Sequence, residues 1–232
     1  MTLLSWTRST IEGTSPRDFF AVAIRPRTYS NLAYLLLAVP LGIVYFALLV
    51  TGFALGIGLV PVLIGVPLLL AMVITGYWLA AFEREMATRL LAVEIPTPER
   101  EIVGSGAWAT ARSYLLAPVT WTGLVYLFAK FLLGIASFVL VVTLGSLTAV
   151  LIGAPLYYGE PSATLFQATN LPGPYVFVWL IDTVPEALVV SGLGLLVGLL
   201  SLHVLNAAAW ASGQFARLLL GHEWLASIRY RE

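Results

Sequence analysis

Three polar side chains lie inside long apolar stretches of the chain: Lys130, His203 and Asn206. Lys130 is the only lysine, and it lies about six residues, or roughly 9 Å, inside the start of its stretch. His203 and Asn206 lie about six and three residues before the end of theirs. If both stretches cross a membrane, the three side chains share one depth, where a charge costs about 2.5–3.5 kcal/mol.

We therefore predict an intramembrane polar cluster of Lys130, His203 and Asn206. Such a cluster would bias the packing of the helices, and it could respond to pH through His203. The alternative is that Lys130 extends its stem to the membrane surface and that His203 bonds a neighbouring backbone carbonyl.

A second set of candidates lies between the third and fourth apolar stretches, in a segment rich in aromatic residues and proline. We interpret it as an aromatic-walled recess for an apolar or amphipathic ligand, formed by Tyr157, Tyr158, Tyr175, Trp179, Asp182 and Glu186. Helix capping is the alternative for the acidic members. Asp182 or Thr183 can cap the following helix, and Glu186 favours the positive end of its dipole.

Signatures of catalysis are absent from the sequence. It contains no phosphate-binding glycine loop, no HExxH, no nucleophile-elbow serine and no acidic pair inside an apolar stretch. It also contains no cysteine, which excludes disulfides, thiolate catalysis and cysteine metal sites. We predict no catalytic residues, no metal site, no cofactor and no enzymatic activity.

The composition is that of a membrane protein. Of the 232 residues, 59% are hydrophobic and 10% are charged, and the mean hydropathy is +0.93. A soluble domain carries about 25% charged residues. Basic and acidic residues are both twelve, so the net charge gives no indication of nucleic acid binding.

Four stretches are long enough to span a membrane, which takes about 20 apolar residues. They cover roughly residues 32–53, 59–82, 124–149 and 187–209. All eleven arginines fall before the first span, between the second and third, or after the fourth. Because basic residues stay on the cytoplasmic side, we predict a multi-pass protein of the plasma membrane with both termini in the cytoplasm.

The first and third spans repeat one sequence at a fixed offset: NLAYLLLAVPLGIVYF begins at Asn31 and GLVYLFAKFLLGIASF at Gly123. The shared residues are Leu32/Leu124, Tyr34/Tyr126, Leu35/Leu127, Gly42/Gly134, Ile43/Ile135 and Phe46/Phe138. Lys130 replaces Ala38. Each copy holds two spans, so both enter the membrane in the same direction, as in a parallel repeat. The repeat could reflect duplication of a stable hairpin or two hairpins that face a cavity.

The predicted fold is therefore all-α, with four transmembrane helices in two parallel-repeat hairpins and amphipathic interfacial helices on the cytoplasmic side. The predicted divisions are an N-terminal interfacial segment (1–24), a first repeat (25–95), a cytoplasmic linker with an interfacial helix (96–117), a second repeat (118–221) with an outer loop (153–183), and a tail (222–232). Gly192, Gly194 and Gly198 permit close helix approach, in an oligomer or within the chain.

Two segments, RTYSNLAYLLLAVPLGIVYFALLVTGFALGIGLVPVLIGVPLL and IDTVPEALVVSGLGLLVGLL, resemble the putative sensor domain family of bacteria and archaea. The resemblance extends from about Arg25 to Gly221. That family has four spans and often precedes a histidine kinase module, so the resemblance implies membrane sensing. Eleven residues follow Gly221 here, and we expect any output to pass through a partner.

Two functions follow as hypotheses. The first is a membrane sensor or regulatory module that responds to an outer-face or membrane-borne signal. The second is a structural or accessory subunit of a membrane complex such as a transporter. In either case we expect contacts with membrane lipids and with a protein partner or further copies of the chain.

Overall fold

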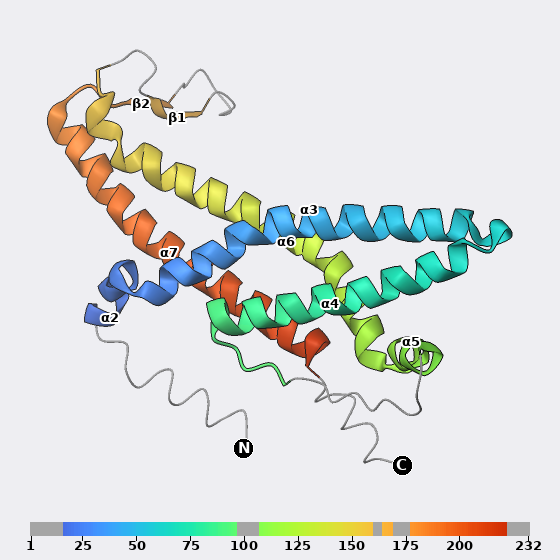
Figure 1. The fold of residues 1–232 in the computed structure, drawn as a ribbon. Helices are drawn as coiled ribbons and strands as arrows, with labels where there is room; N and C mark the ends of the chain where they lie inside the picture. Colours follow the sequence, from blue (N-terminus) through green and yellow to red (C-terminus); the bar gives the residue numbers. More distant parts are fainter. Residues whose placement is uncertain (1–15, 97–106, 160–163, 169–176, 222–232) are drawn as a thin grey trace. The chain divides into compact units, whose positions relative to one another are not determined.

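Four long helices make up most of the protein (Figure 1). The computed structural model describes residues 16–96, 107–159, 164–168 and 177–221. The long helices are α3 (Pro26–Gly58), α4 (Gly65–Leu91), α6 (Pro118–Ile152) and α7 (Val184–Leu220). Each is long and apolar enough to cross a membrane, which confirms the four predicted spans and a multi-pass helical membrane protein. The helices extend beyond the predicted spans, except that α4 begins at Gly65, six residues after the predicted start of the second span.

The chain forms two compact units, and the boundaries between them fall within α6 and α7. The α3–α4 unit consists of Pro26–Val141 and of the chain from Leu205 onward. The α6–α7 unit consists of Val142–Val204 and of the chain up to Arg25. The predicted division into two repeats with a linker and tails stays a prediction, and its segments 1–15, 97–106 and 222–232 lie outside the described residues.

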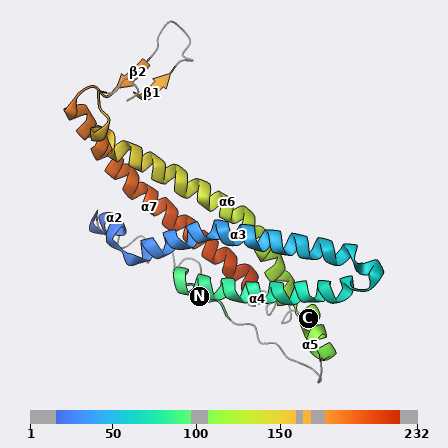
Figure 2. The ribbon, with the colours of Figure 1, turned by 45° about the horizontal axis from the view of Figure 1, so that its top comes forward.

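In the α3–α4 unit, α3 and α4 form a hairpin and lie side by side (Figures 1 and 2). The connection includes the 3-10 helix η2 (Val60–Val62) and Leu63 in the left-handed conformation. A Cβ atom at Gly65 would come within 2.2 Å of the carbonyl oxygen of Gly56. Only glycine fits there, so the turn that reverses the chain depends on Gly65.

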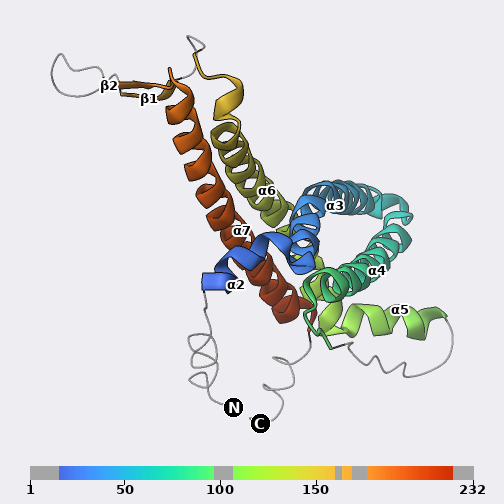
Figure 3. The same cartoon turned by 90° about the vertical axis from the view of Figure 1, so that its left-hand side faces the viewer.

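The short helix α5 (Ala107–Leu116) packs against α4 and crosses it rather than running along it (Figures 1 and 3). The ring of Tyr114 meets Tyr77 of α4 edge to face at 5.1 Å between centroids. At the junction of α5 with α6, the indole N–H of Trp121 donates to the carbonyl oxygen of Leu115 at 2.9 Å. The segment predicted to precede the second copy as a helix is therefore helical.

In the α6–α7 unit, the end of α6 packs against the beginning of α7. A small core joins Ala154 of the 3-10 helix η3 (Ala154–Leu156) to Ile181 and to residues of α7. A Cβ atom at Gly194 would come within 2.7 Å of the backbone of Ile152, and one at Gly198 within 2.9 Å of Thr148. These two glycines therefore serve packing within the chain. The unit also holds α2 (Pro16–Ala21) and the 3-10 helix η1 (Val22–Ile24).

The segment between α6 and α7 adds a feature that we did not predict, a pair of antiparallel strands. They are β1 (Thr164–Ala168) and β2 (Phe177–Leu180), with Phe166 opposite Trp179. Their β-branched and aromatic residues favour strands, but the runs are too short to give a clear alternating pattern. The sequence therefore predicts only a loop here.

Candidate functional site

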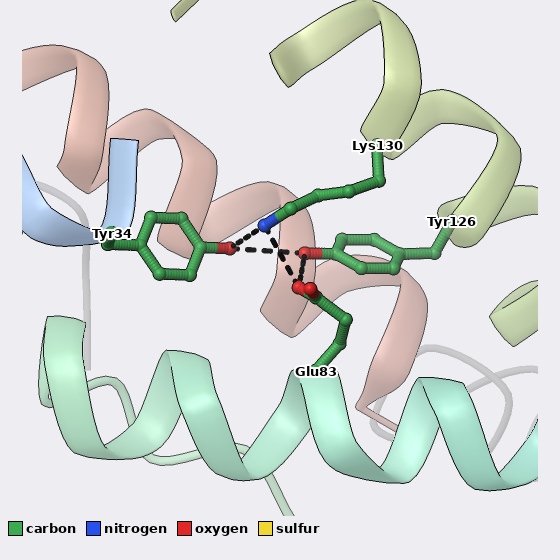
Figure 4. A network of polar contacts seen from close by, with 4 residues as sticks. All are labelled: Tyr34, Glu83, Tyr126 and Lys130. Atoms are coloured by element: carbon green, nitrogen blue, oxygen red, sulfur yellow. Dashed lines mark hydrogen bonds and ion pairs between the residues drawn. The ribbon is translucent and has the colours of Figure 1, made fainter. Parts of the chain in front are cut away.

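A buried ion pair lies within the α3–α4 unit (Figure 4). The ammonium Nζ of Lys130 on α6 is 2.9 Å from carboxylate Oε2 of Glu83 on α4, and the side chains are 2% and 0% exposed. The alternative in which Lys130 extends to the membrane surface is therefore wrong. Charged residues in membrane helices face the bundle interior and pair, because lipid cannot solvate them.

Two tyrosines complete this arrangement, which we call the buried network: Tyr34, Glu83, Tyr126 and Lys130 (Figure 4). Lys130 donates to the hydroxyl of Tyr34 at 2.8 Å, and Tyr126 donates to Oε2 of Glu83 at 3.1 Å. The two hydroxyls are 3.2 Å apart. The Lys130 ammonium also lies 4.0 Å from the centre of the Tyr34 ring, within range of a cation–π interaction. Three helices are thereby joined at one polar point.

The tyrosines of the buried network are equivalent positions of the two sequence copies, 92 residues apart. The helices around them cross with reciprocal contacts. A Cβ atom at Gly42 would come within 2.9 Å of the Lys130 carbonyl oxygen, and one at Gly134 within 2.5 Å of the Ala38 carbonyl oxygen. Reciprocal contacts of this kind are those of a pair related by a two-fold axis. These contacts relate only α3 to α6. The arrangement of all four helices as two parallel hairpins therefore stays a prediction.

The hydrogen-bonding capacity of the buried network is not filled by the described residues. Oε2 of Glu83 is bonded twice, whereas Oε1 of Glu83 is buried and has no partner among them. The hydroxyl of Tyr45 is also buried and lies close enough to Glu83 to interact with its carboxylate. An unsatisfied buried polar group costs about 1–3 kcal/mol.

The other two members of the predicted polar cluster have different partners. Asn206 of α7 accepts from the amide of Asn31 at 2.8 Å and donates to the hydroxyl of Thr28 at 3.1 Å. The ring of His203 stacks on Phe19 at 4.8 Å, and its Nε2 lies 3.3 Å from the Phe19 carbonyl oxygen. Asn206 belongs to the same unit as Lys130, while His203 belongs to the α6–α7 unit. A single cluster of all three stays a prediction.

Comparison with known proteins places the chain in a family. The family described as "Putative sensor" matches residues 34–220, which include the whole buried network. The chain belongs to this family. No curated protein and no solved structure matches it.

The outer-loop candidates of this sensor-family protein lie in the α6–α7 unit. The hydroxyl of Tyr157 donates to the carbonyl oxygen of Val150 at 2.5 Å, and Tyr158 is exposed. Trp179 lies in β2, and Tyr175 lies outside the described residues. The predicted ligand-binding recess stays a prediction.

The acidic candidates lie at the start of α7. Oε2 of Glu186 accepts from the backbone N–H groups of Asp182 and Thr183 at 3.1 and 3.3 Å. The hydroxyl of Thr183 accepts in return from the N–H of Glu186 at 3.5 Å. This reciprocal pattern is a capping box, which satisfies backbone donors at a helix start. Helix capping therefore accounts for the contacts of Glu186.

Sequence reasoning missed Glu83 because the second predicted span ended at Phe82, one residue earlier. In this sensor-family chain α4 continues to Leu91, so Glu83 lies well inside a helix. A signal was present, because charged residues inside membrane spans commonly pair with one another. Tyr34 and Tyr126 were visible as repeated residues, but nothing in the repeat showed that they would meet. Among the described residues, no group of three or more His, Asp or Glu is placed to hold a metal ion.

Proposed function

We propose that this protein is a sensing module of the plasma membrane that has both termini in the cytoplasm and no catalytic reaction of its own. Membership in the sensor family and the four candidate spans support this proposal. The positions of the arginines support the orientation. All eleven lie in the sequence near or beyond the start of α3, the end of α4, the start of α6 or the end of α7, which are the ends proposed to face the cytoplasm.

The buried network is the observation that carries the proposal. Breaking the pair of Lys130 and Glu83 would leave two buried charges without counter-ions, which is strongly unfavourable. The helices therefore have two discrete packing states, one with the ion pair formed and one with it broken, as a switch requires. A signal that favours one packing of α3, α4 and α6 would shift the population between them.

The C-terminal end of α4 offers a route for output. The side chains of Arg27 and Ser30 on α3 donate to the carbonyl oxygens of Leu91 and Leu90 at that end. A Cβ atom at Gly213 of α7 would come within 2.8 Å of Val93. A movement of α4 at Glu83 would thus reach helix ends on the proposed cytoplasmic side. There a partner protein or a second copy would receive it.

The segment between α6 and α7 is the proposed input from the outer face. Leu156 is 90% exposed and Tyr158 is also exposed, so apolar surface is available for an apolar or amphipathic ligand. Membrane lipids are the second proposed source of signal. Replacing Tyr158 with alanine should weaken the response to an outer-face ligand and leave the response to bilayer thickness unchanged.

A distance measurement tests the proposed switch. Spin labels at Leu63→Cys and Leu132→Cys would report on the α3–α4 unit, in which both side chains are exposed. In nanodiscs, Lys130→Leu should populate a second distance, and the charge swap Lys130→Glu with Glu83→Lys should restore the first. Identical distances in the wild type and in Lys130→Leu, in thin and thick bilayers alike, would contradict the proposal.

Native mass spectrometry of the full-length protein in gentle detergent tests the partner. A second copy or a stoichiometric protein partner is expected. A monomer without partner or retained lipid would count against both a sensor and an accessory subunit. Burial of the segment between α6 and α7 against another chain would instead favour the subunit.

A further inference from the structure

Arg84 of α4 differs from the other charged residues around it. Its neighbour Glu83 is paired with Lys130. One residue further on, Glu85 is paired with Arg89 at 2.5 Å on the exposed side of the helix. Arg84 is only 8% exposed, and its Nε is buried without a hydrogen-bond partner in the described part of the chain. The acidic groups of α4 are thus committed to other bases.

A buried guanidinium cannot relieve this situation by losing its proton. It carries five N–H donors in a fixed fork, and it stays protonated in proteins. A charge removed from water is tolerated only when an opposite charge and hydrogen bonds compensate for it. Among the described residues, Nε of Arg84 has no acceptor that would compensate for its burial, so an anion would stabilise this side chain.

The surroundings of Arg84 are aromatic on one side and closely packed on the other. Tyr77 lies within electrostatic range of Arg84, and it lies two helical turns earlier on the same face. The Tyr77 ring packs against Tyr114 of α5. One turn before Arg84, Ala80 lies where a Cβ atom at Gly123 of α6 would come within 2.9 Å. Helices α5 and α6 therefore meet this face of α4 one to two turns before Arg84, and we call this place the junction.

We propose that Arg84 binds the phosphate group of a membrane phospholipid at this junction. The guanidinium fork matches two phosphate oxygens, which makes arginine suited to this anion. Arg84 precedes the end of α4 at Leu91 by seven residues, or roughly 10 Å. By the distribution of arginines, that end faces the cytoplasm, so the guanidinium lies near the headgroup level.

A lipid fits this position better than a soluble anion, because large apolar side chains are exposed on α5 and α6 near the junction. Leu116 at the end of α5 and Trp121 at the start of α6 are both exposed. Tryptophan is enriched at the headgroup level of membranes. Acyl chains would contact these residues while the phosphate meets Arg84. The inference concerns binding alone and holds whether or not the protein is a sensor.

Binding to the delipidated full-length protein in neutral detergent tests this inference. The probes are dihexanoyl phosphatidylglycerol, dihexanoylglycerol, which lacks the phosphate, and inorganic phosphate, each titrated by native mass spectrometry. We expect the phosphatidylglycerol to bind most tightly, with at least a tenfold loss in Arg84→Gln. Arg89→Gln, the matched change on the exposed side of α4, should bind within twofold of the wild type.

The outcomes separate the possibilities. Arg84→Lys keeps the charge and loses the fork, so intermediate affinity is expected and gives a second comparison if Arg84→Gln folds poorly. Equal affinity of the wild type, Arg84→Gln and Arg84→Lys would overturn the inference, as would equal losses in Arg84→Gln and Arg89→Gln. Inorganic phosphate that binds as tightly as the phospholipid would overturn the assignment to a lipid.

Discussion

At the scale of single residues, Glu83 and Lys130 depend on each other, because the charge of each compensates for the burial of the other. Replacing Lys130 with leucine leaves a buried carboxylate without its counter-ion. We expect Lys130→Leu to lower the free energy of unfolding by about 3–5 kcal/mol. Adding Glu83→Leu should recover most of that loss, since two apolar side chains need no pairing. Reversible unfolding in mixed micelles measures both values.

The exposed pair of Glu85 and Arg89 on the same helix provides the control for this cycle. Arg89→Gln should change the free energy of unfolding by only about 0.3–0.5 kcal/mol, because water solvates both groups. A double variant as unstable as Lys130→Leu alone would contradict the assigned pairing.

The tyrosine hydroxyls around the pair should also contribute measurably. Tyr126 donates to a charged oxygen of Glu83 in a buried place. Such bonds contribute about 1.5–3 kcal/mol, and we expect Tyr126→Phe to lose about that much. Tyr158→Phe, at an exposed position, should be neutral in the same unfolding measurement. Equal stability of the two variants would show that the Tyr126 bond contributes nothing.

At the scale of helices, the crossing of α3 and α6 depends on glycines that bring two backbones together. A methyl group at Gly134 would come within 2.5 Å of the Ala38 carbonyl oxygen. Because a backbone atom cannot rotate away, the helices must separate. We expect Gly134→Ala to lower the midpoint of thermal unfolding, with a loss of about 1–3 kcal/mol.

Gly145 on the same helix is the matched control, since a Cβ atom there meets nothing within 4 Å. Gly145→Ala should be neutral, or stabilising by up to about 1 kcal/mol, because alanine favours helix over glycine. A Gly134→Ala variant as stable as Gly145→Ala would show that the close crossing does not form.

At the scale of the whole molecule, the proposed orientation can be tested with single cysteines, because the chain has none of its own. Leu63 in the α3–α4 connection is 78% exposed and Leu156 is 90% exposed. We expect Leu63→Cys and Leu156→Cys to react with a membrane-impermeant maleimide in whole cells. Arg89→Cys, whose native side chain is 76% exposed, should react only after permeabilisation. Labelling of Arg89→Cys in intact cells would contradict the orientation.

Much of this architecture follows from the sequence by itself. Four apolar stretches determine four helices, because lipid leaves backbone N–H and C=O groups no partner outside the helix. The charge of Lys130 inside one of them predicted either a polar contact within the membrane or a side chain that extends to its surface. The repeat determined that Tyr34 and Tyr126 occupy equivalent positions. Each of these conclusions needs only the residues of one helix, or a comparison of two segments of the sequence.

Only the tertiary structure decided which groups meet. Lys130 lies against Glu83 rather than elsewhere because α4 remains helical beyond its apolar stretch and α6 crosses it there. Asn206 bonds Asn31 and Thr28 because the end of α7 packs on the start of α3. Arg84 is buried for a similar reason, and its Nε has no hydrogen-bond partner among the described residues. Partner choice depends on where helices cross, and crossings depend on contacts between residues that are far apart in the sequence.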